Sequence, residues 1–292
     1  QGILAPTLAM KFRNKHSIGV SLLVGIQRFS ARGLGNFQCF TKSVATNPAN
    51  AATCPQGFAV KTSNGLTNND SDWSYGAGAR IGWMGEMNSR LTLGASASSK
   101  IYMSEFDDYD ELFAEDGDFD IPANVTLGVT FKATPNLKLS FDFQRIFYEG
   151  VNSISNEGPV VSPLGVGPAP PCANDCWLGM KDGMGFGWED INVYRVAAEY
   201  AYGAQWIFRT GFSYNQQPIP KDQVLFNFLA PASIQKHATV GFTFIPNKNS
   251  EWNLAYMHAF REKVQSNKTA FGIPGSLEMY QNSVDVSYSY KF

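Results

Sequence analysis

The sequence of 292 residues has few charged side chains and no long apolar run. Charged residues make up 16% of the chain, below the roughly 25% that is usual in soluble domains. The net charge of −2 argues against binding to nucleic acid, which requires a concentrated basic face. No segment approaches the ~18 consecutive apolar residues of a membrane-spanning helix. A membrane-spanning strand needs only ~10 residues of alternating polarity, so this class is not excluded.

Histidine is also scarce. The three histidines, His16, His237 and His258, lie in a turn, at the start of a predicted strand and on a predicted outward face. They show neither metal-ligand spacing nor a grouped nucleophile and acid. We therefore expect no enzyme activity, no metal site and no cofactor.

The four cysteines fall into two pairs, Cys39 with Cys54 and Cys172 with Cys176, in segments rich in Gly, Pro and Asn. This placement predicts loop disulfides in an oxidising compartment. A zinc site at the second pair is the weaker interpretation, because it would require a second close pair or nearby histidines.

The most regular pattern is at the end of the chain. The predicted strand 278–292 ends in VDVSYSYKF, in which apolar and polar residues alternate. Period 2 with one wholly apolar face predicts a half-buried strand. A terminal Phe that closes such a strand is similar to the C-terminal signal of bacterial outer-membrane barrels. The alternative is an ordinary edge strand of a soluble sandwich.

The same alternation recurs along the whole chain. The predicted strands are 2–12, 17–27, 73–87, 90–102, 124–133, 137–148, 191–202, 206–214, 238–244, 252–260 and 278–292. Tight turns and long loops separate them alternately, and Tyr and Trp lie near strand ends. This is typical of an antiparallel transmembrane β-barrel of the outer-membrane type, whereas sandwich strands are nearer ~5–6 residues.

The number of predicted strands is odd. Single-chain bacterial barrels normally have even strand numbers, and an open barrel would expose unpaired backbone groups to lipid. We therefore expect residues 1–292 to form one barrel domain from which an odd number of initial strands is missing. The alternative is that partner strands come from elsewhere.

Several segments resemble the FadL family of outer-membrane channels for hydrophobic substrates, and together the resemblance covers essentially the whole chain. The segments are LFAEDGDFDIPA (112–123), GWEDINV (187–193), NQQPIP (215–220), FNFLAP (226–231), MYQ (279–281) and SYSYKF (287–292). The resemblance implies a barrel of 14 strands with an N-terminal hatch, so three strands and the hatch would be missing here.

The resemblance also implies a function. We expect a channel in the bacterial outer membrane for passive uptake of hydrophobic molecules, either long-chain fatty acids or aromatic hydrocarbons. It would act as a monomer, in contact with the lipid bilayer and lipopolysaccharide. The alternative is a general porin or structural surface barrel for polar solutes.

Loops 33–72 and 104–120 correspond to the external capture groove of the family. In the second loop Phe106, Tyr109, Leu112 and Phe113 follow a helical spacing, opposite acidic residues. This predicts a short amphipathic helix whose apolar side binds a hydrophobic ligand outside the membrane. Alternatively, these side chains simply pack on a neighbouring loop or on the barrel rim.

Two arginines on the predicted inner face are further candidates. Arg195 and Arg209 lie on adjacent strands, where they could together bind a carboxylate of the substrate. The alternative is stronger, because charged residues inside barrels commonly pair with one another.

Overall fold

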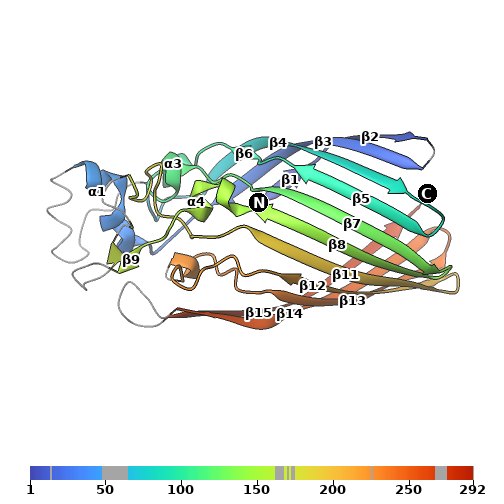
Figure 1. Cartoon of the computed structure of the whole chain (residues 1–292). Coiled ribbons are helices and arrows are strands. Elements are labelled where there is room, and N and C mark those ends of the chain that lie inside the picture. The colour runs from blue at the N-terminus through green and yellow to red at the C-terminus, as the bar shows by residue number, and fades with distance from the viewer. Residues whose placement is uncertain are drawn as a thin grey trace.

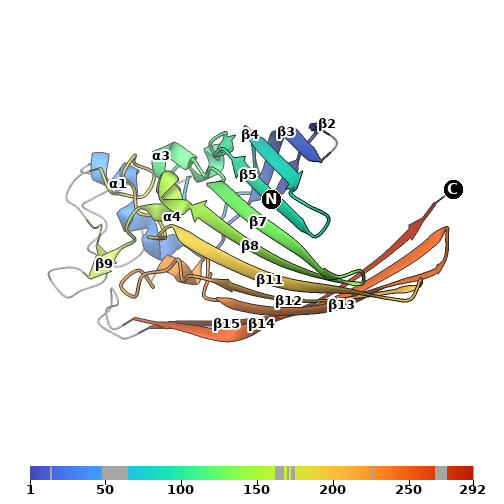
Figure 2. The same cartoon turned by 45° about the vertical axis from the view of Figure 1, so that its right-hand side comes forward.

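The computed structural model describes residues 1–13, 15–47, 65–161, 168–169, 171, 175–224, 226–266 and 275–291. Its main element is an antiparallel sheet of 13 strands, seen as a curved wall in Figures 1 and 2. The strands are β1 (Gly2–Leu4), β2 (Thr7–Phe12), β3 (His16–Phe29), β4 (Asp72–Glu86), β5 (Leu91–Ser98), β6 (Tyr102–Met103), β7 (Ala123–Thr134), β8 (Leu137–Phe147), β11 (Ile191–Tyr202), β12 (Trp206–Asn215), β13 (Lys236–Asn247), β14 (Ser250–Gln265) and β15 (Ser276–Tyr290).

The strands follow one another through the sheet in chain order, from β1 to β15. Neighbours pair antiparallel with few register shifts, and all of the predicted strands are confirmed. Two of them are interrupted. The strand predicted over 2–12 divides at Pro6, which has no N–H to donate, and the strand predicted over 90–102 divides into β5 and β6.

One face of the sheet is apolar and exposed. Large side chains on this face include Val20, Ile81, Leu127, Val196, Val240 and Val286. No second sheet covers them among the described strands, as it would in a soluble sandwich. At ~3.3 Å per residue and a tilt of ~40°, a strand of 12 residues such as β11 spans about 30 Å, the thickness of a bilayer core. The sheet is therefore suited to face lipid.

The long connections and the helical turns gather at one end of the sheet, and the tight turns lie at the other (Figure 1). The helical elements are the 3-10 helices η1 (Gly35–Phe40), η3 (Asp107–Tyr109), η4 (Tyr148–Gly150) and η5 (Phe226–Phe228), and the α-helices α1 (Lys42–Thr46), α3 (Ala114–Gly117) and α4 (Asn152–Ser155). A two-stranded sheet, β9 (Val160–Val161) with β10 (Pro168–Ala169), lies in the third loop. None of the described helices is long and apolar enough to cross a membrane.

The cysteine prediction is only partly covered by the described residues. Cys39 and Cys176 lie within them, and neither is a free thiol. Cys54 and Cys172 lie outside the described residues, so the two pairings stay predictions.

A close approach of β6 to β4 explains a glycine on β4. A Cβ atom at Gly76 would lie 2.3 Å from the carbonyl oxygen of Tyr102 and 2.4 Å from the sulfur of Met103. Both Tyr102 and Met103 belong to β6, which pairs with β4 at this point. The glycine thus lets β6 lie close against β4 before the chain enters the second loop.

We expect Gly76→Ala to destabilise the protein by about 1–3 kcal/mol, because the methyl group must push β6 away from the sheet. The measurement is the urea midpoint of unfolding in lipid vesicles. Gly82→Ala on the same strand is the control, since the atoms nearest to its Cβ are 3.8 Å away. Equal midpoints for the two variants would contradict the close-approach explanation.

Candidate functional site

The loop-bearing end contains a buried apolar cluster, here called the loop core. It draws side chains from four long loops that are far apart in the sequence. Its buried members are Leu34, Phe37, Leu66, Phe106, Tyr109, Leu112, Phe113, Leu178, Met184, Phe186 and Phe226. All four residues that the sequence singles out in the second loop are therefore buried together, and they pack on neighbouring loops.

Tyr109 ties two of these loops together. Its side chain is fully buried, and its hydroxyl accepts a hydrogen bond from the backbone N–H of Ala31 at 3.0 Å. The carbonyl oxygens of Asn69 and Asp70 lie 3.0 and 3.2 Å from the same hydroxyl, as acceptors. Both ends of the first loop are thus held by one side chain of the second loop.

Phe29, the last residue of β3, connects the sheet to the loop core. Its ring lies 4.8 Å from that of Tyr109 and 4.9 Å from that of Phe113, in edge-to-face contacts. A third contact joins it to Phe106 at 5.8 Å. Such aromatic pairs add about 0.5–1.5 kcal/mol each beyond area burial, so the loop core is anchored to the barrel.

The predicted amphipathic helix over 106–113 is wrong. Only the turn η3 is helical there, and α3 after it contains left-handed backbone at Glu115 (φ 55°) and Asp116 (φ 60°). Helical spacing also fits a chain that folds back on itself, because close packing with other loops can gather the same side chains.

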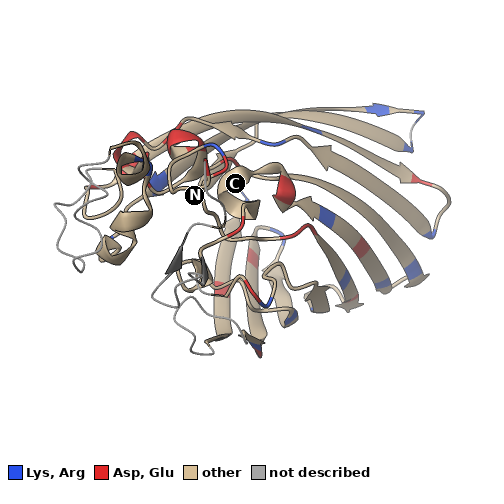
Figure 3. Cartoon of the chain, turned by 60° about the vertical axis from the view of Figure 1, so that its left-hand side comes forward, with Lys and Arg blue, Asp and Glu red and all other residues tan. Residues whose placement is uncertain are grey.

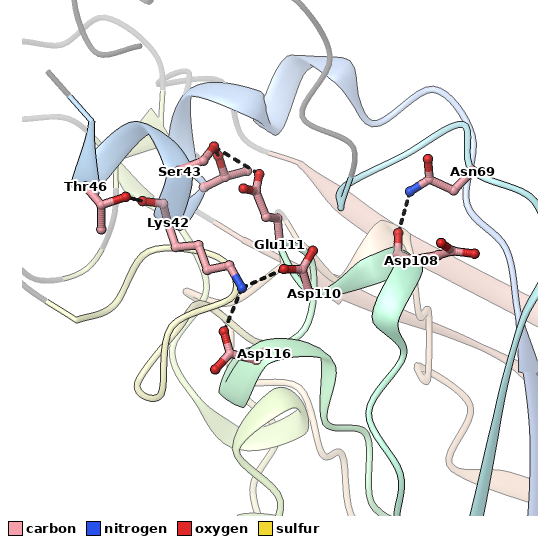
Figure 4. A network of polar contacts seen from close by, with 9 residues as sticks. Lys42, Ser43, Thr46, Asn69, Asp108, Asp110, Glu111 and Asp116 are labelled. Atoms are coloured by element: carbon pink, nitrogen blue, oxygen red, sulfur yellow. Dashed lines mark hydrogen bonds and ion pairs between the residues drawn. The ribbon is translucent and has the colours of Figure 1, made fainter. Parts of the chain in front are cut away.

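The acidic side of the second loop is not simply solvated, as Figure 4 shows. Lys42 of α1 forms ion pairs with Asp110 at 2.7 Å and Asp116 at 2.6 Å. The hydroxyl of Ser43 donates a hydrogen bond to the buried Glu111 at 3.1 Å. Although burial alone would lower the pKa of Lys42, its hydrogen bonds to Asp110 and Asp116 raise it. The ammonium group therefore clamps the first loop to the second.

The loop core borders a cavity of about 240 Å³, here called the loop cavity. Its lining residues are Phe29, Ser30, Ala31, Arg32, Leu34, Leu112, Phe113, Ser153, Met184, Phe186, Phe226 and Leu229. Arg32 is the one charged side chain in this lining, and it is exposed. Of the four apolar residues singled out from the sequence, Leu112 and Phe113 line the cavity, whereas Phe106 and Tyr109 are absent from its lining.

A carboxyl pair lies where the second loop returns to the sheet. Asp120 is buried, forms an ion pair with Lys100 at 2.6 Å and accepts the backbone N–H of Met103 at 2.6 Å. Partial burial of Asp118, the charge of Asp120 and a hydrogen bond between the two raise the pKa of Asp118 to about 7. This group therefore changes charge near neutral pH.

The structure does not bring Arg195 and Arg209 together. On the paired strands β11 and β12, Arg195 lies opposite Ser213, and Arg209 lies opposite Glu199. Arg195 donates to the side-chain oxygen of Gln144 at 2.7 Å.

Arg209 belongs to a ladder of polar contacts across neighbouring strands. Glu199 pairs with Arg209 at 2.8 Å and with Lys138 on β8 at 2.8 Å. Arg209 also donates to Thr243 on β13 at 2.6 Å. Charged residues of both signs follow these strands in Figure 3, and the ladder matches the alternative of mutually paired charges.

The comparison with known families decides the assignment. The family model described as outer membrane protein transport protein (OMPP1/FadL/TodX) matches residues 2–292. The chain belongs to this family. The resemblance to FadL proteins is thereby confirmed, and the protein is an outer-membrane β-barrel that serves transport and not an enzyme.

Solved structures of this family have the same fold. The toluene transporter TodX of P. putida is 20% identical, with 97% of this chain and 67% of that chain covered and a TM-score of 0.56. The toluene transporter TbuX of Ralstonia pickettii is 18% identical, with 99% and 67% covered and a TM-score of 0.57. A FadL homologue of Pseudomonas aeruginosa is 15% identical, with 99% and 67% covered and a TM-score of 0.55. No curated protein matches the chain.

Sequence reasoning missed the contribution of the third and fourth loops to the loop cavity. Met184, Phe186 and Phe226 line the loop cavity, but they lie in segments without alternation or helical spacing. The available signal was the resemblance itself. The family-like segment 187–193 directly follows Phe186, and the family-like segment 226–231 includes Phe226 and Leu229 of the cavity lining.

The carboxyl pair predicts a pH dependence of the loops. The pKa of Asp118 in the folded protein lies above its ordinary value of 3.8, so its stabilising contribution is full below that value and is lost as pH rises through about 7. Hydrogen exchange of residues 101–121, corrected for the intrinsic effect of pH, should therefore be slower below pH 7 than above it.

Asp118→Asn should remove most of this pH dependence, because the amide stays neutral. Asp107→Asn, at an exposed position of the same loop, is the control and should keep it. An unchanged pH profile in Asp118→Asn would show that another group is responsible.

Proposed function

We propose that the protein is a channel for passive uptake of hydrophobic small molecules, and that the loop cavity is where they are first captured. The observation that carries the proposal is the mostly apolar lining of this cavity, which lies at the loop-bearing end and begins at Phe29, the last residue of β3. An apolar molecule gains about 25 cal/mol per Å² when it leaves water for such a lining. Capture therefore needs neither an energy source nor a cofactor.

The size of the cavity favours a single aromatic ring. Apolar cavities of ~150 Å³ in proteins bind benzene, and the loop cavity of about 240 Å³ leaves room for a substituted ring. A long-chain fatty acid would extend well beyond this volume. That TodX and TbuX, which share the fold, are toluene transporters supports a monoaromatic substrate.

One observation favours a fatty acid as the second candidate. Arg32 is the charged residue at the cavity, and a guanidinium group is a natural partner of a carboxylate. The carboxylate would pair with Arg32 while the chain entered the loop cavity. Arg195 and Arg209 are less suited to this role, because each already contacts a neighbouring side chain.

The proposal includes the lipids that surround the protein. The exposed apolar face of the sheet contacts the lipid bilayer, and lipopolysaccharide surrounds the loop-bearing end. The channel acts as a monomer. Substrate leaves the loop core toward the inner face of the sheet, where polar side chains pair with one another and offer no strong site for an apolar molecule.

The test is binding of radiolabelled toluene and of radiolabelled oleate to the protein in lipid vesicles. For the wild type we expect saturable binding of toluene. The double variant Leu112→Asp, Phe113→Asp should lose at least about tenfold in affinity, because a ligand must then bind beside buried charges. Phe228→Asp is the matched control, since Phe228 is exposed in the fourth loop and is absent from the cavity lining.

Three results would distinguish the alternatives. Saturable binding of oleate that is lost in Arg32→Ala would favour the fatty acid. Toluene binding that survives in the double variant would contradict capture in the loop cavity. No binding of either ligand, together with passage of small sugars through vesicles that carry the protein, would support a porin instead.

A further inference from the structure

A second cavity lies next to the loop cavity, closer to the sheet. This inner cavity measures about 410 Å³. Its apolar lining comes from Phe119, Ile121, Pro122, Ile146, Tyr148, Ile154, Phe186, Trp188 and Ala230, and Gln1, Asp120 and Asn124 add polar groups. Ile146 of β8 and Asn124 of β7 contribute from the sheet. Among the described residues, Phe186 is the only one that lines both cavities.

The backbone that carries Phe186 is held firmly against α4. The N–H of Gly187 donates to the carbonyl of Asn156 at 2.8 Å, and the side chain of Asn156 donates to the carbonyl of Gly183 at 2.8 Å. A Cβ atom at Gly185 would lie 2.9 Å from the carbonyl oxygen of Ser153. The main chain therefore has little room to move on this side.

Asn227 holds the same segment from the other side. Its fully buried amide nitrogen donates to the carbonyls of Phe186 at 2.6 Å and Gln223 at 2.7 Å. Its side-chain oxygen accepts the indole N–H of Trp188 at 2.5 Å. Because both sides of the amide group are engaged, Asn227 fixes the backbone of Phe186 and one wall of the inner cavity together.

The ring of Phe186 is held by much weaker contacts than its backbone. It stacks on Phe226 with a centroid distance of 5.5 Å and lies 6.1 Å from the ring of Trp188. An incoming apolar molecule can replace such contacts, because dispersion and area burial are not directional. Rotation of this one side chain is thus the smallest change that joins the two cavities.

We propose that the ring of Phe186 is a gate between two successive positions of the substrate, with Asn227 as its positioning residue. The inference rests on the proposed function and adds the step that follows capture. A molecule in the loop cavity passes to the inner cavity when the ring turns aside, and the width of this opening limits the substrate to about one aromatic ring. Phe186 then selects substrates by width.

The experiment compares uptake of toluene with uptake of naphthalene, which is wider by a second fused ring. Uptake is measured in cells that carry the protein in their outer membrane, and folded protein is quantified by its heat-dependent mobility on gels. In Phe186→Ala the ratio of naphthalene to toluene uptake should rise about tenfold, a typical discrimination by pocket size. The concentration of toluene for half-maximal uptake should rise as well, because the loop cavity loses one wall.

Two further variants separate a gate from simple packing. Asn227→Leu keeps the branching at Cγ but makes no hydrogen bonds, so the gate should become loose and the uptake ratio should rise in the same direction. Phe228→Ala is the matched control and should leave the ratio at the wild-type value, since Phe228 is exposed and lines neither cavity. If Phe186→Ala does not assemble, Phe186→Leu provides the same test with a smaller opening.

An uptake ratio within about twofold of wild type in correctly assembled Phe186→Ala would overturn the gate, because a smaller side chain would then have no effect on selection by width. Equal loss of uptake for both compounds would also overturn it, since it would show a purely structural role. A wild type that takes up neither compound above cells that lack the protein would contradict the proposed function itself. The failure of the gate and the failure of the channel are thus distinguishable.

Discussion

The architecture depends on the requirement that every backbone N–H and C=O within a bilayer has a hydrogen-bond partner. Here that requirement is met by antiparallel pairing on both sides of the sheet's strands from β3 to β14, whereas β1, β2, β6 and β15 each pair on one side among the described strands. Strand pairing leaves the side chains free to differ between the two faces, apolar toward lipid and polar toward the interior. Irregular backbone is then restricted to the strand ends, which is where the loop core and both cavities lie.

The loop core is built from these irregular segments at the strand ends. The first two loops are held by Tyr109, by the ring contacts of Phe29 and by the ion pairs of Lys42, and Asn227 of the fourth loop holds the third. Polar links lie at the periphery of the core and aromatic rings lie inside it. The loop cavity is the space that these side chains leave unfilled.

The strands were predictable because alternation has a direct physical cause, one face in lipid and one in water. The strand predicted over 191–202 has the same bounds as β11. The loops were less predictable. The spacing of Phe106, Tyr109, Leu112 and Phe113 correctly marked buried residues but wrongly indicated a helix. Asn227 contacts Phe186 from a different loop, and such contacts produce no periodic pattern in the sequence.

The most direct test of the account is a crystal structure of the protein soaked with bromobenzene, with the bromine located by its anomalous scattering. The account predicts a bromine site inside the loop cavity, among Leu34, Leu112 and Phe226, that is absent in the Leu112→Asp, Phe113→Asp variant. Bromine sites only on the lipid-facing side of the sheet, with the loop cavity empty, would contradict capture of hydrophobic substrates by the loop core.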